Sequence, residues 1–360
     1  MFGLRLLSKF LEGEKPKVDS GRCVRKFLKA KCESCRRDCP KGAIELANLP
    51  RVDEALCNGC GVCVNACPAG VFVLPAVTRL KSSGGARLAC SRAGNGPQRG
   101  LDIPCLGALS EGDLLAALAK RDILALDASP CGKCDSQRAL AVIERTAERT
   151  NSILKALANS KIIEIEYRVR ESQVAEPYSR REFLSHLRGR AVKVAAESLE
   201  GVLEEVPLLS TTPKVANDVV SAKHVLLQRQ IESMVATSSA LSRAELPYGR
   251  PGRPVECRYC GLCALVCPSA ALRVNDTDES WDLVLESWRC VDCKACSQVC
   301  PVGSLPYSES VEATAFLEDH QEVLVHCDKR ICVSCGCRFP SPDATDICPS
   351  CRKAKEVAFS

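Results

Sequence analysis

The stretch Cys257-Arg258-Tyr259-Cys260-Gly261-Leu262-Cys263-Ala264-Leu265-Val266-Cys267-Pro268 decides how this chain folds. Its spacing is C-x2-C-x2-C-x3-C-P, and residues 57–68 and 290–301 repeat it. In such a run, three thiolates in a tight loop hold one cubane [4Fe-4S] cluster, and the fourth cysteine, before proline, reaches a second cluster nearby. Zinc sites and disulfide frameworks do not need this three-plus-one spacing. The pattern therefore predicts paired [4Fe-4S] clusters.

The crossing of the fourth cysteine assigns the ligands of the C-terminal pair. We expect one cluster at site 3, which consists of Cys257, Cys260, Cys263 and Cys300. Its neighbour is site 4, which consists of Cys267, Cys290, Cys293 and Cys296. Short apolar pieces between the two motifs suit small strands that pack over the clusters; they are Leu272, Val274, Leu283 and Val284.

The N-terminal pair departs from the pattern at one position. Lys29 occupies the place of the first cysteine, and the nearest upstream cysteine is Cys23. If residues 24–31 loop out, site 1 consists of Cys23, Cys32, Cys35 and Cys67. Site 2 then consists of Cys39, Cys57, Cys60 and Cys63. The alternative for site 1 is a three-iron cluster or none, with Cys23 a buried thiol.

The two pairs look like a duplication. After each of the four cysteine–proline steps, small residues precede an apolar one, at residues 41–44, 69–72, 269–272 and 302–305. Residues 20–75 and 250–308 resemble two bacterial-type dicluster ferredoxin modules. This resemblance covers about a third of the chain and implies electron transfer rather than bond-making chemistry.

The middle of the chain has an α/β rhythm. We expect strand-like runs at residues 87–90, 101–105 and 122–127, and helices at residues 111–120 and 136–158. Ser110 and Asp113 form a capping-box pattern at the start of the first helix. Strand ends meet at one sheet edge, so four cysteines could form a site there (site M), namely Cys90, Cys105, Cys131 and Cys134.

Three interpretations of site M remain open. It binds a [2Fe-2S] or a further [4Fe-4S] cluster, or Cys131 and Cys134 form a thioredoxin-like redox pair, or all four are inert buried thiols. The segment resembles the small iron–sulfur subunit of methanogen-type hydrogenases, in its strand–Cys–Ala-Gly opening, Pro-Cys-x-Gly middle and late cysteine pair. The resemblance implies a transfer site without naming a partner.

Residues 159–250 contain no cysteine. We expect a strand at residues 161–170 and charged helices at residues 179–203 and 214–241, which together make a helical spacer. The Ser179–Leu184 stretch resembles a twin-arginine export motif, but it is internal and no apolar run follows, so we interpret it as a helix start. Residues 2–11 predict a short amphipathic helix that docks on protein; attachment to a membrane surface is the weaker alternative.

The C-terminal tail predicts a zinc ribbon. Its ligands are two cysteine pairs, Cys332 with Cys335 and Cys348 with Cys351 (the ribbon site). Rubredoxin-like iron is the alternative metal, because the same four thiolates bind either ion. Cys327 and Cys337 stay unassigned, and His326 is interpreted as a surface group.

Composition supports metal binding inside the cell. The chain has 26 cysteines among 360 residues, and a reducing cytosol keeps thiols free for metals. It has no apolar run long enough to span a bilayer and no secretory signal, so we expect a cytoplasmic location. The net charge of +5 comes without a basic stripe interleaved with aromatic residues, so we expect no nucleic-acid partner.

Together these features predict an α+β multi-domain protein. The expected domains are an N-terminal dicluster module (1–80), an α/β domain with a cysteine site (81–170), a helical spacer (171–250), a C-terminal dicluster module (251–310) and a ribbon (311–360). No dinucleotide loop, P-loop or nucleophile–base pair is present, so catalysis by this chain alone is not expected. The predicted function is that of an electron-transfer subunit in a hetero-complex, linking a donor to a catalytic subunit of an anaerobic oxidoreductase.

Two other functions compete with this prediction. The chain could be a thiol or heterodisulfide-type reductase that uses Cys131 and Cys134. It could also be a maturation or assembly factor for an anaerobic oxidoreductase.

Overall fold

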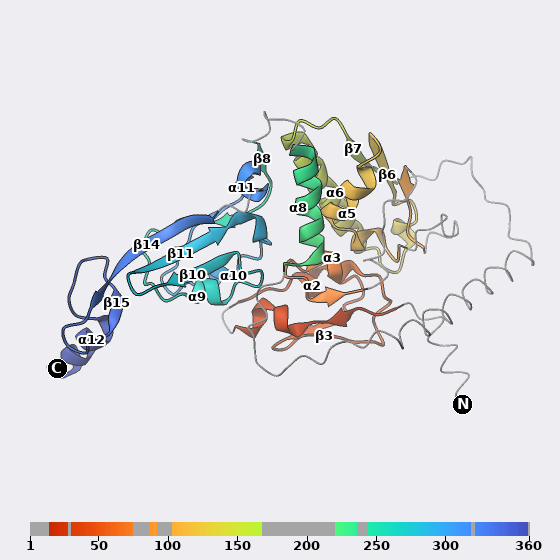
Figure 1. Cartoon of the computed structure of the whole chain (residues 1–360). Coiled ribbons are helices and arrows are strands. Elements are labelled where there is room, and N and C mark those ends of the chain that lie inside the picture. The colour runs from red at the N-terminus through yellow and green to blue at the C-terminus, as the bar shows by residue number, and fades with distance from the viewer. Residues whose placement is uncertain are drawn as a thin grey trace, which may run out of the picture. The chain divides into compact units, whose positions relative to one another are not determined.

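The computed structural model describes residues 14–27, 30–74, 86–91, 103–167, 220–235, 244–317 and 321–358. Within these ranges the chain is a mixed α+β protein with several small sheets (Figure 1). The helices predicted at residues 2–11 and 179–203, and the Ser179–Leu184 stretch, lie outside the described residues. Among the described helices, none has the length and apolarity needed to cross a membrane.

The N-terminal module (residues 14–27 and 30–74) is built from two small antiparallel strand pairs. Strand β1 (Lys17–Val18) pairs with β4 (Phe72–Val73), and β2 (Ile44–Leu46) pairs with β3 (Pro50–Val52). Two short helices, α2 (Ser34–Asp38) and α3 (Val62–Ala66), each end at a cysteine–proline step. Two 3-10 turns precede them, Ser20–Arg22 and Val24–Lys26.

The C-terminal module (residues 244–317) repeats this plan. Its outer strands pair antiparallel, and its central hairpin contains all four apolar residues predicted to form strands. The short helices are again placed between the third and fourth cysteine of each motif. The elements are β8 (Glu245–Leu246), β9 (Arg250–Pro251), α9 (Leu262–Leu265), β10 (Leu272–Asp276), β11 (Ser280–Glu286), a 3-10 turn (Ser287–Arg289), α10 (Ala295–Val299), β12 (Tyr307–Ser308), β13 (Val311–Glu312) and α11 (Ala313–Leu317).

The tail is joined to this module by a shared sheet. Strand β14 (Gln321–Ile331) pairs with β11 and then with β15 (Arg338–Pro340), which gives the strand order β10-β11-β14-β15. Helix α12 (Pro349–Ala358) begins directly after Cys348 and contains Cys351. Strand β14 thus adds a third strand to the β10–β11 hairpin of the C-terminal module.

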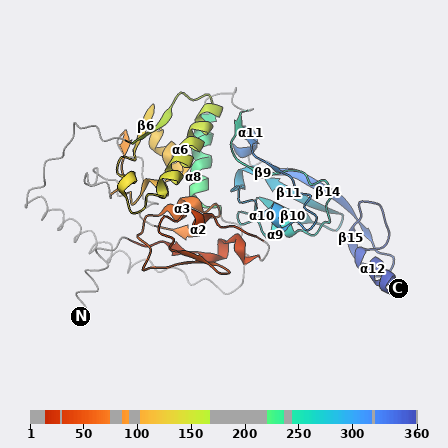
Figure 2. The same ribbon diagram turned by 180° about the vertical axis from the view of Figure 1, so that it is seen from behind.

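The middle region (residues 86–91 and 103–167) contains the predicted α/β unit. Strands β5 (Arg87–Leu88), β6 (Ile123–Asp127) and β7 (Ile162–Glu166) form a parallel sheet in that order. Helices α5 (Glu111–Leu118) and α6 (Ala139–Ala156) pack against each other, and α6 packs against β7 (Figure 1). Figure 2 shows α6 from the opposite side. These elements confirm both predicted helices and the strand at residues 122–127. Residues 103–105 do not form the predicted strand; Cys105 is extended and leads into a 3-10 turn, Leu106–Ala108.

The start of α5 confirms the predicted capping box. The backbone N–H of Ser110 donates to Asp113 Oδ2 at 2.8 Å, and the N–H of Asp113 donates to Ser110 Oγ at 3.4 Å. Together these bonds satisfy donors that a helix N-terminus leaves without intrahelical partners. The polar pair therefore fixes where the helix begins.

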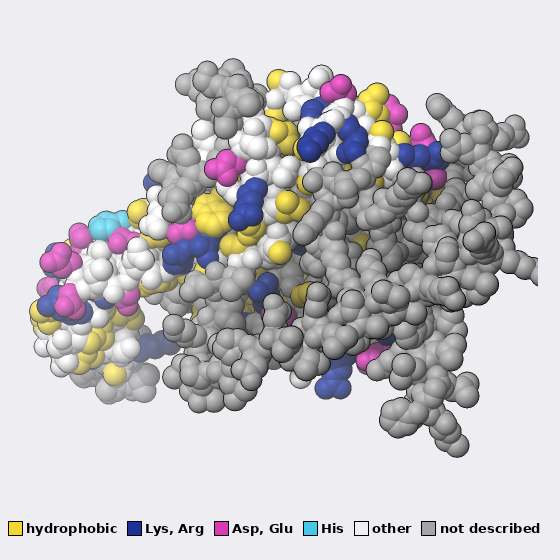
Figure 3. Space-filling model, turned by 45° about the vertical axis from the view of Figure 1, so that its right-hand side comes forward, with side chains coloured by type: hydrophobic (Ala, Val, Ile, Leu, Met, Phe, Trp, Pro, Cys, Tyr) yellow, Lys and Arg dark blue, Asp and Glu magenta, His cyan; other side chains and the backbone are white. Residues whose placement is uncertain are grey.

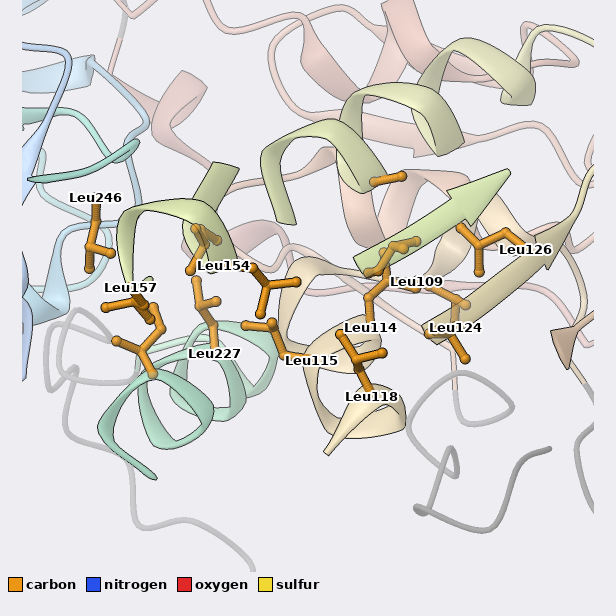
Figure 4. Packing of buried hydrophobic residues seen from close by; sticks show 14 of the residues in the cluster. Leu109, Leu114, Leu115, Leu118, Leu124, Leu126, Leu154, Leu157, Leu227 and Leu246 are labelled. Atoms are coloured by element: carbon orange, nitrogen blue, oxygen red, sulfur yellow. The ribbon is translucent and has the colours of Figure 1, made fainter. Parts of the chain in front are cut away.

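Helix α8 (Ala222–Val235) belongs to the core of the middle region. Leu227 and Ile231 of α8 are fully buried against leucines of α5 and α6, and Figure 4 shows Leu227 facing Leu115 and Leu154. The sequence predicts a spacer here because the helix carries many polar residues. The structure differs because a narrow apolar face is enough to complete a neighbouring core.

Candidate metal centres

All 26 cysteines lie in the described part of the chain, and none of them forms a disulfide bond. Twenty-four of them gather into six groups, which are the four predicted ferredoxin-type sites, site M and the ribbon site, and Cys327 and Cys337 are the other two. Thiols held close together and free of disulfides are the donor set that iron and zinc require.

Left-handed backbone shapes each regular cysteine loop. In every complete motif, the residue before the second cysteine and the residue after it have positive φ. Such a conformation costs energy for any residue with a side chain and little for glycine. The residues are Gly59 (70°), Gly61 (76°), Tyr259 (53°), Gly261 (67°), Asp292 (53°) and Lys294 (57°).

The tails after the four cysteine–proline steps share a second turn. The third residue after each fourth cysteine is left-handed, and its N–H donates to that cysteine's carbonyl. These residues are Gly42, Gly70, Ala270 and Gly303. In the N-terminal module the next N–H reaches the sulfur itself, with Ala43 N–H 3.3 Å from Cys39 Sγ and Val71 N–H 3.5 Å from Cys67 Sγ. The recurring tail in the sequence is therefore a turn that aims backbone donors at thiolates.

Site 1 brings together the four predicted cysteines, including the displaced one. A single cavity is lined by Cys23, Cys32, Cys35 and Cys67. Burial, followed by the nearby thiolates of Cys67, Cys32 and Cys23, raises the pKa of Cys35 to about 12. Residues 24–26 of the predicted loop form a 3-10 turn, and Lys29 lies outside the described residues.

Site 2 is also assembled across the module. Burial, together with the thiolates of Cys60, Cys39 and Cys57, raises the pKa of Cys63 above its usual range. Cys39 comes from the first motif and the other three from the second, so the fourth cysteine crosses over as the motif predicts. The crossing ties the two halves of the module together.

Sites 3 and 4 have the same crossed arrangement. Burial and then the neighbouring Cys267, Cys290 and Cys296 thiolates raise the pKa of Cys293. At site 3, burial and then Cys260 and Cys300 raise the pKa of Cys257. The two sites differ in access to solvent, because Cys260 is exposed whereas all four site 4 thiols are at least half-buried.

Site M brings Cys90, Cys105 and Cys131 together with Cys134. Burial and then the thiolates of Cys60, Cys90 and Cys131 raise the pKa of Cys105 to about 12. Cys90 and Cys131 follow the carboxyl ends of β5 and β6. Burial and then Cys90 and Cys134 raise the pKa of Cys131 to about 11.

The ribbon site is a four-cysteine metal site. The Sγ atoms of its four cysteines all lie within 4.8 Å of one another. The N–H of Cys348 donates to Cys332 Sγ at 3.3 Å and lowers the pKa of that thiol to about 6. A lowered pKa favours the thiolate, which is the form that binds a metal. Zinc and iron fit this donor set equally well.

The structure also places the two unassigned cysteines. Cys337 Sγ lies 3.3 Å from Cys335 Sγ, so it is a fifth thiol beside the ribbon site. Cys327, buried on β14, lies close to Tyr259, whose pKa is raised to about 12 by burial and then by Cys327. The Cys337 contact is local, because Cys337 is two residues from Cys335. The position of Cys327 depends on the pairing of β14 with β11, which no spacing rule predicts. His326 is exposed and its Nδ1 lies 2.5 Å from Asp282 Oδ1.

Comparison with protein families gives two matches. A 4Fe-4S dicluster domain matches residues 256–304, and a 4Fe-4S binding domain matches residues 49–72. The chain contains 4Fe-4S domains. The first match spans all the cysteines of sites 3 and 4, and the second spans residues 57–67. Neither reaches the middle region, so the hydrogenase resemblance gains no support.

No curated protein and no solved structure matches the chain. The functional argument therefore depends on the two matched domains and on the geometry of the cysteine sites.

Proposed function

We propose that the chain is an iron–sulfur electron-transfer subunit that relays electrons between a donor and a catalytic oxidoreductase partner. Sites 1 to 4 would bind four [4Fe-4S] clusters, and site M a [2Fe-2S] cluster or a further [4Fe-4S] cluster. The ribbon site would hold zinc or iron. The observation that carries the proposal is the convergence of four thiols, drawn from both motifs of a module, at a single cavity at site 1.

The protein's own groups would set how readily each site accepts an electron. A bound [4Fe-4S] cluster supplies reversible one-electron chemistry. Burial of the cysteines excludes water, and backbone N–H groups that donate to sulfur stabilise negative charge. The N–H of Tyr259 lies 3.3 Å from Cys257 Sγ, and the N–H of Ser136 lies 3.4 Å from Cys134 Sγ. Such bonds favour the reduced and more negative state.

Redox proteins are the partners that this chemistry fits. A reduced one-electron donor would deliver electrons, and an oxidised catalytic subunit would accept them, within a hetero-complex. On the face drawn in Figure 3, described basic and acidic side chains are interspersed. This distribution supports a protein partner more than a nucleic acid, which requires a continuous basic surface.

The test is anaerobic purification with analysis of iron, zinc and acid-labile sulfide, followed by EPR of the reduced protein. We expect about 16 cubane iron atoms with matching sulfide, additional iron at site M and one metal ion at the ribbon site. A Cys57→Ala variant should lose the iron of site 2 and keep the rest. A colourless protein without inorganic sulfide would overturn the proposal.

A further inference from the structure

The sites lie beside one another in a sequence that begins at site M. Cys105 of site M and Cys60 of site 2 belong to one buried cluster, which also contains Val62, Ala139 and Val142. The exposed fraction of both thiols is small, 9% for Cys105 and 8% for Cys60. Site M is therefore in contact with site 2 through a dry interface.

Sites 2 and 1 share the core of the N-terminal module. Cys63 and Cys39 of site 2 are buried in the same cluster as Cys23, Cys35 and Cys67 of site 1. Site 1 thus follows site 2.

Site 1 meets site 4 across the two modules. Val24 and Ala30 pack with Val266 and residues of α10 in one buried cluster, and Cys32 and Cys293 both lie against it. The backbone N–H of Lys31 donates to Gln298 Oε1 at 2.9 Å. Because Cys32 belongs to site 1 and Cys293 to site 4, these two sites flank a single apolar contact.

Site 3 comes last in the sequence. Cys267 and Cys296 of site 4 belong to one buried cluster, and Cys257, Cys263 and Cys300 of site 3 pack against it. Cys260 of site 3 is exposed, and its neighbours Val255 and Leu265 are exposed apolar residues at 89% and 52%. Site 3 is thus next to site 4 and open to solvent.

The first turn of α8 touches both modules at the crossing point. Lys223 Nζ donates to Val64 O at 3.2 Å and to Asn65 O, in helix α3 between Cys63 and Cys67. His224 Nε2–H donates to Trp288 O at 2.7 Å, two residues before Cys290. Two adjacent residues of one helix therefore hold the N-terminal and the C-terminal module.

The residue before α8 and a residue of α6 also contact the two modules at this point. A Cβ atom added at Gly70 would lie 2.6 Å from Ser221 Cβ, so the tail of site 1 presses on the residue before α8. From α6, Arg149 donates to Asp292 Oδ2 at 3.2 Å, in the site 4 loop. Helices α6 and α8 therefore both contribute to the contact between the N-terminal and C-terminal modules.

We propose that the five cysteine sites form one unbranched electron path in the order site M, site 2, site 1, site 4, site 3, and that the first turn of α8 holds its inter-module step. The proposal rests on the proposed function. Site M and site 3 are then the two ends of the path, so the two redox partners bind at opposite ends. Every electron that passes from one module to the other must pass through site 1.

The test uses magnetic interaction between reduced clusters in the full-length protein, measured by EPR power saturation. The starting variant is Cys260→Ala, which removes site 3 and leaves site 1 as the neighbour of site 4. Adding Cys35→Ala should then isolate site 4, so its signal saturates at lower power. Adding Cys57→Ala instead removes site 2 and should leave the saturation of site 4 unchanged.

A second variant tests the role of α8 without touching a cluster ligand. His224→Leu should weaken the interaction between sites 1 and 4 with the iron content unchanged, and Gln230→Leu, farther along α8, should not. The order is wrong if Cys57→Ala also isolates site 4, if Cys35→Ala leaves it unchanged, or if the starting variant shows no interaction. The role of α8 is wrong if His224→Leu behaves as Gln230→Leu. In each of these cases normal iron and sulfide would leave the proposed function standing.

Discussion

The middle region and the N-terminal module are held together by different chemistry. The buried cluster of the middle region consists mainly of leucine and isoleucine from α5, α6, α8 and the sheet, joined by residues of β8, β13 and α11, with no cysteine among its fully buried members. In the buried cluster of the N-terminal module, five of ten residues are cysteines. A region with so little apolar packing depends on metal for stability, whereas a leucine core does not.

The largest effect that tests this comparison is removal of iron. Anaerobic chelation should unfold residues 17–73 and 250–308, because thiols that lose their metal leave small cores with too little buried apolar surface. Helices α5 and α6 should stay folded. Hydrogen exchange read by mass spectrometry checks both parts in one sample, and equal loss of protection in α6 would contradict the contrast.

A leucine substitution tests the other side of the comparison. Leu124 of β6 is fully buried, and Leu124→Ala should lower the free energy of unfolding of the middle region by about 2–5 kcal/mol. The neighbouring Ile123 is 51% exposed, so Ile123→Ala should change it by less than about 0.5 kcal/mol. Iron content should be normal in both variants. Denaturant titration followed by hydrogen exchange gives the values, and similar costs for the two would refute the assigned core.

Substitution of two buried cysteines, Cys23 and Cys327, distinguishes a cysteine that binds metal from one that only packs. Cys23 is 7% exposed and lines the site 1 cavity, whereas Cys327 is 4% exposed and lies outside the six predicted sites. Cys23→Ser should therefore remove about four iron atoms, or leave a three-iron cluster. Cys327→Ser should keep all the iron. Iron analysis with EPR decides between them, and iron loss in Cys327→Ser would make this thiol a ligand.

The smallest expected effect is on the midpoint reduction potential of the cluster at site 1. Lys223 lies near Cys67. Burial lowers the pKa of Lys223, and the negative charge of the Cys67 thiolate acts in the opposite direction. Lys223→Met should lower the midpoint potential of site 1, because the reduced state loses a stabilising charge. Lys155→Met, on the exposed side of α6, should leave it unchanged. Spectroelectrochemical titration measures both, and an unaltered potential in Lys223→Met would show that the charge does not reach the site.

Motif spacing predicted most of the candidate site, because the loops are local. Residues within one C-x2-C-x2-C run are held close by a few backbone angles, and the left-handed positions at Gly61 and Gly261 explain why glycine recurs there. The capping pair Ser110 and Asp113 was predictable for the same reason. The predicted domain boundaries stay a prediction.

The sequence by itself determined that this chain contains 4Fe-4S domains, a four-cysteine site near the C-terminus and a small α/β unit. Only the tertiary structure decided that Cys23 reaches Cys67, that α8 completes the leucine core and that Lys31 meets Gln298 of the other module. The physical reason is the separation along the chain of the residues that make each contact. Spacing and periodicity encode contacts within a turn or a loop, whereas contacts between distant segments depend on how complementary surfaces pack once those local units have formed.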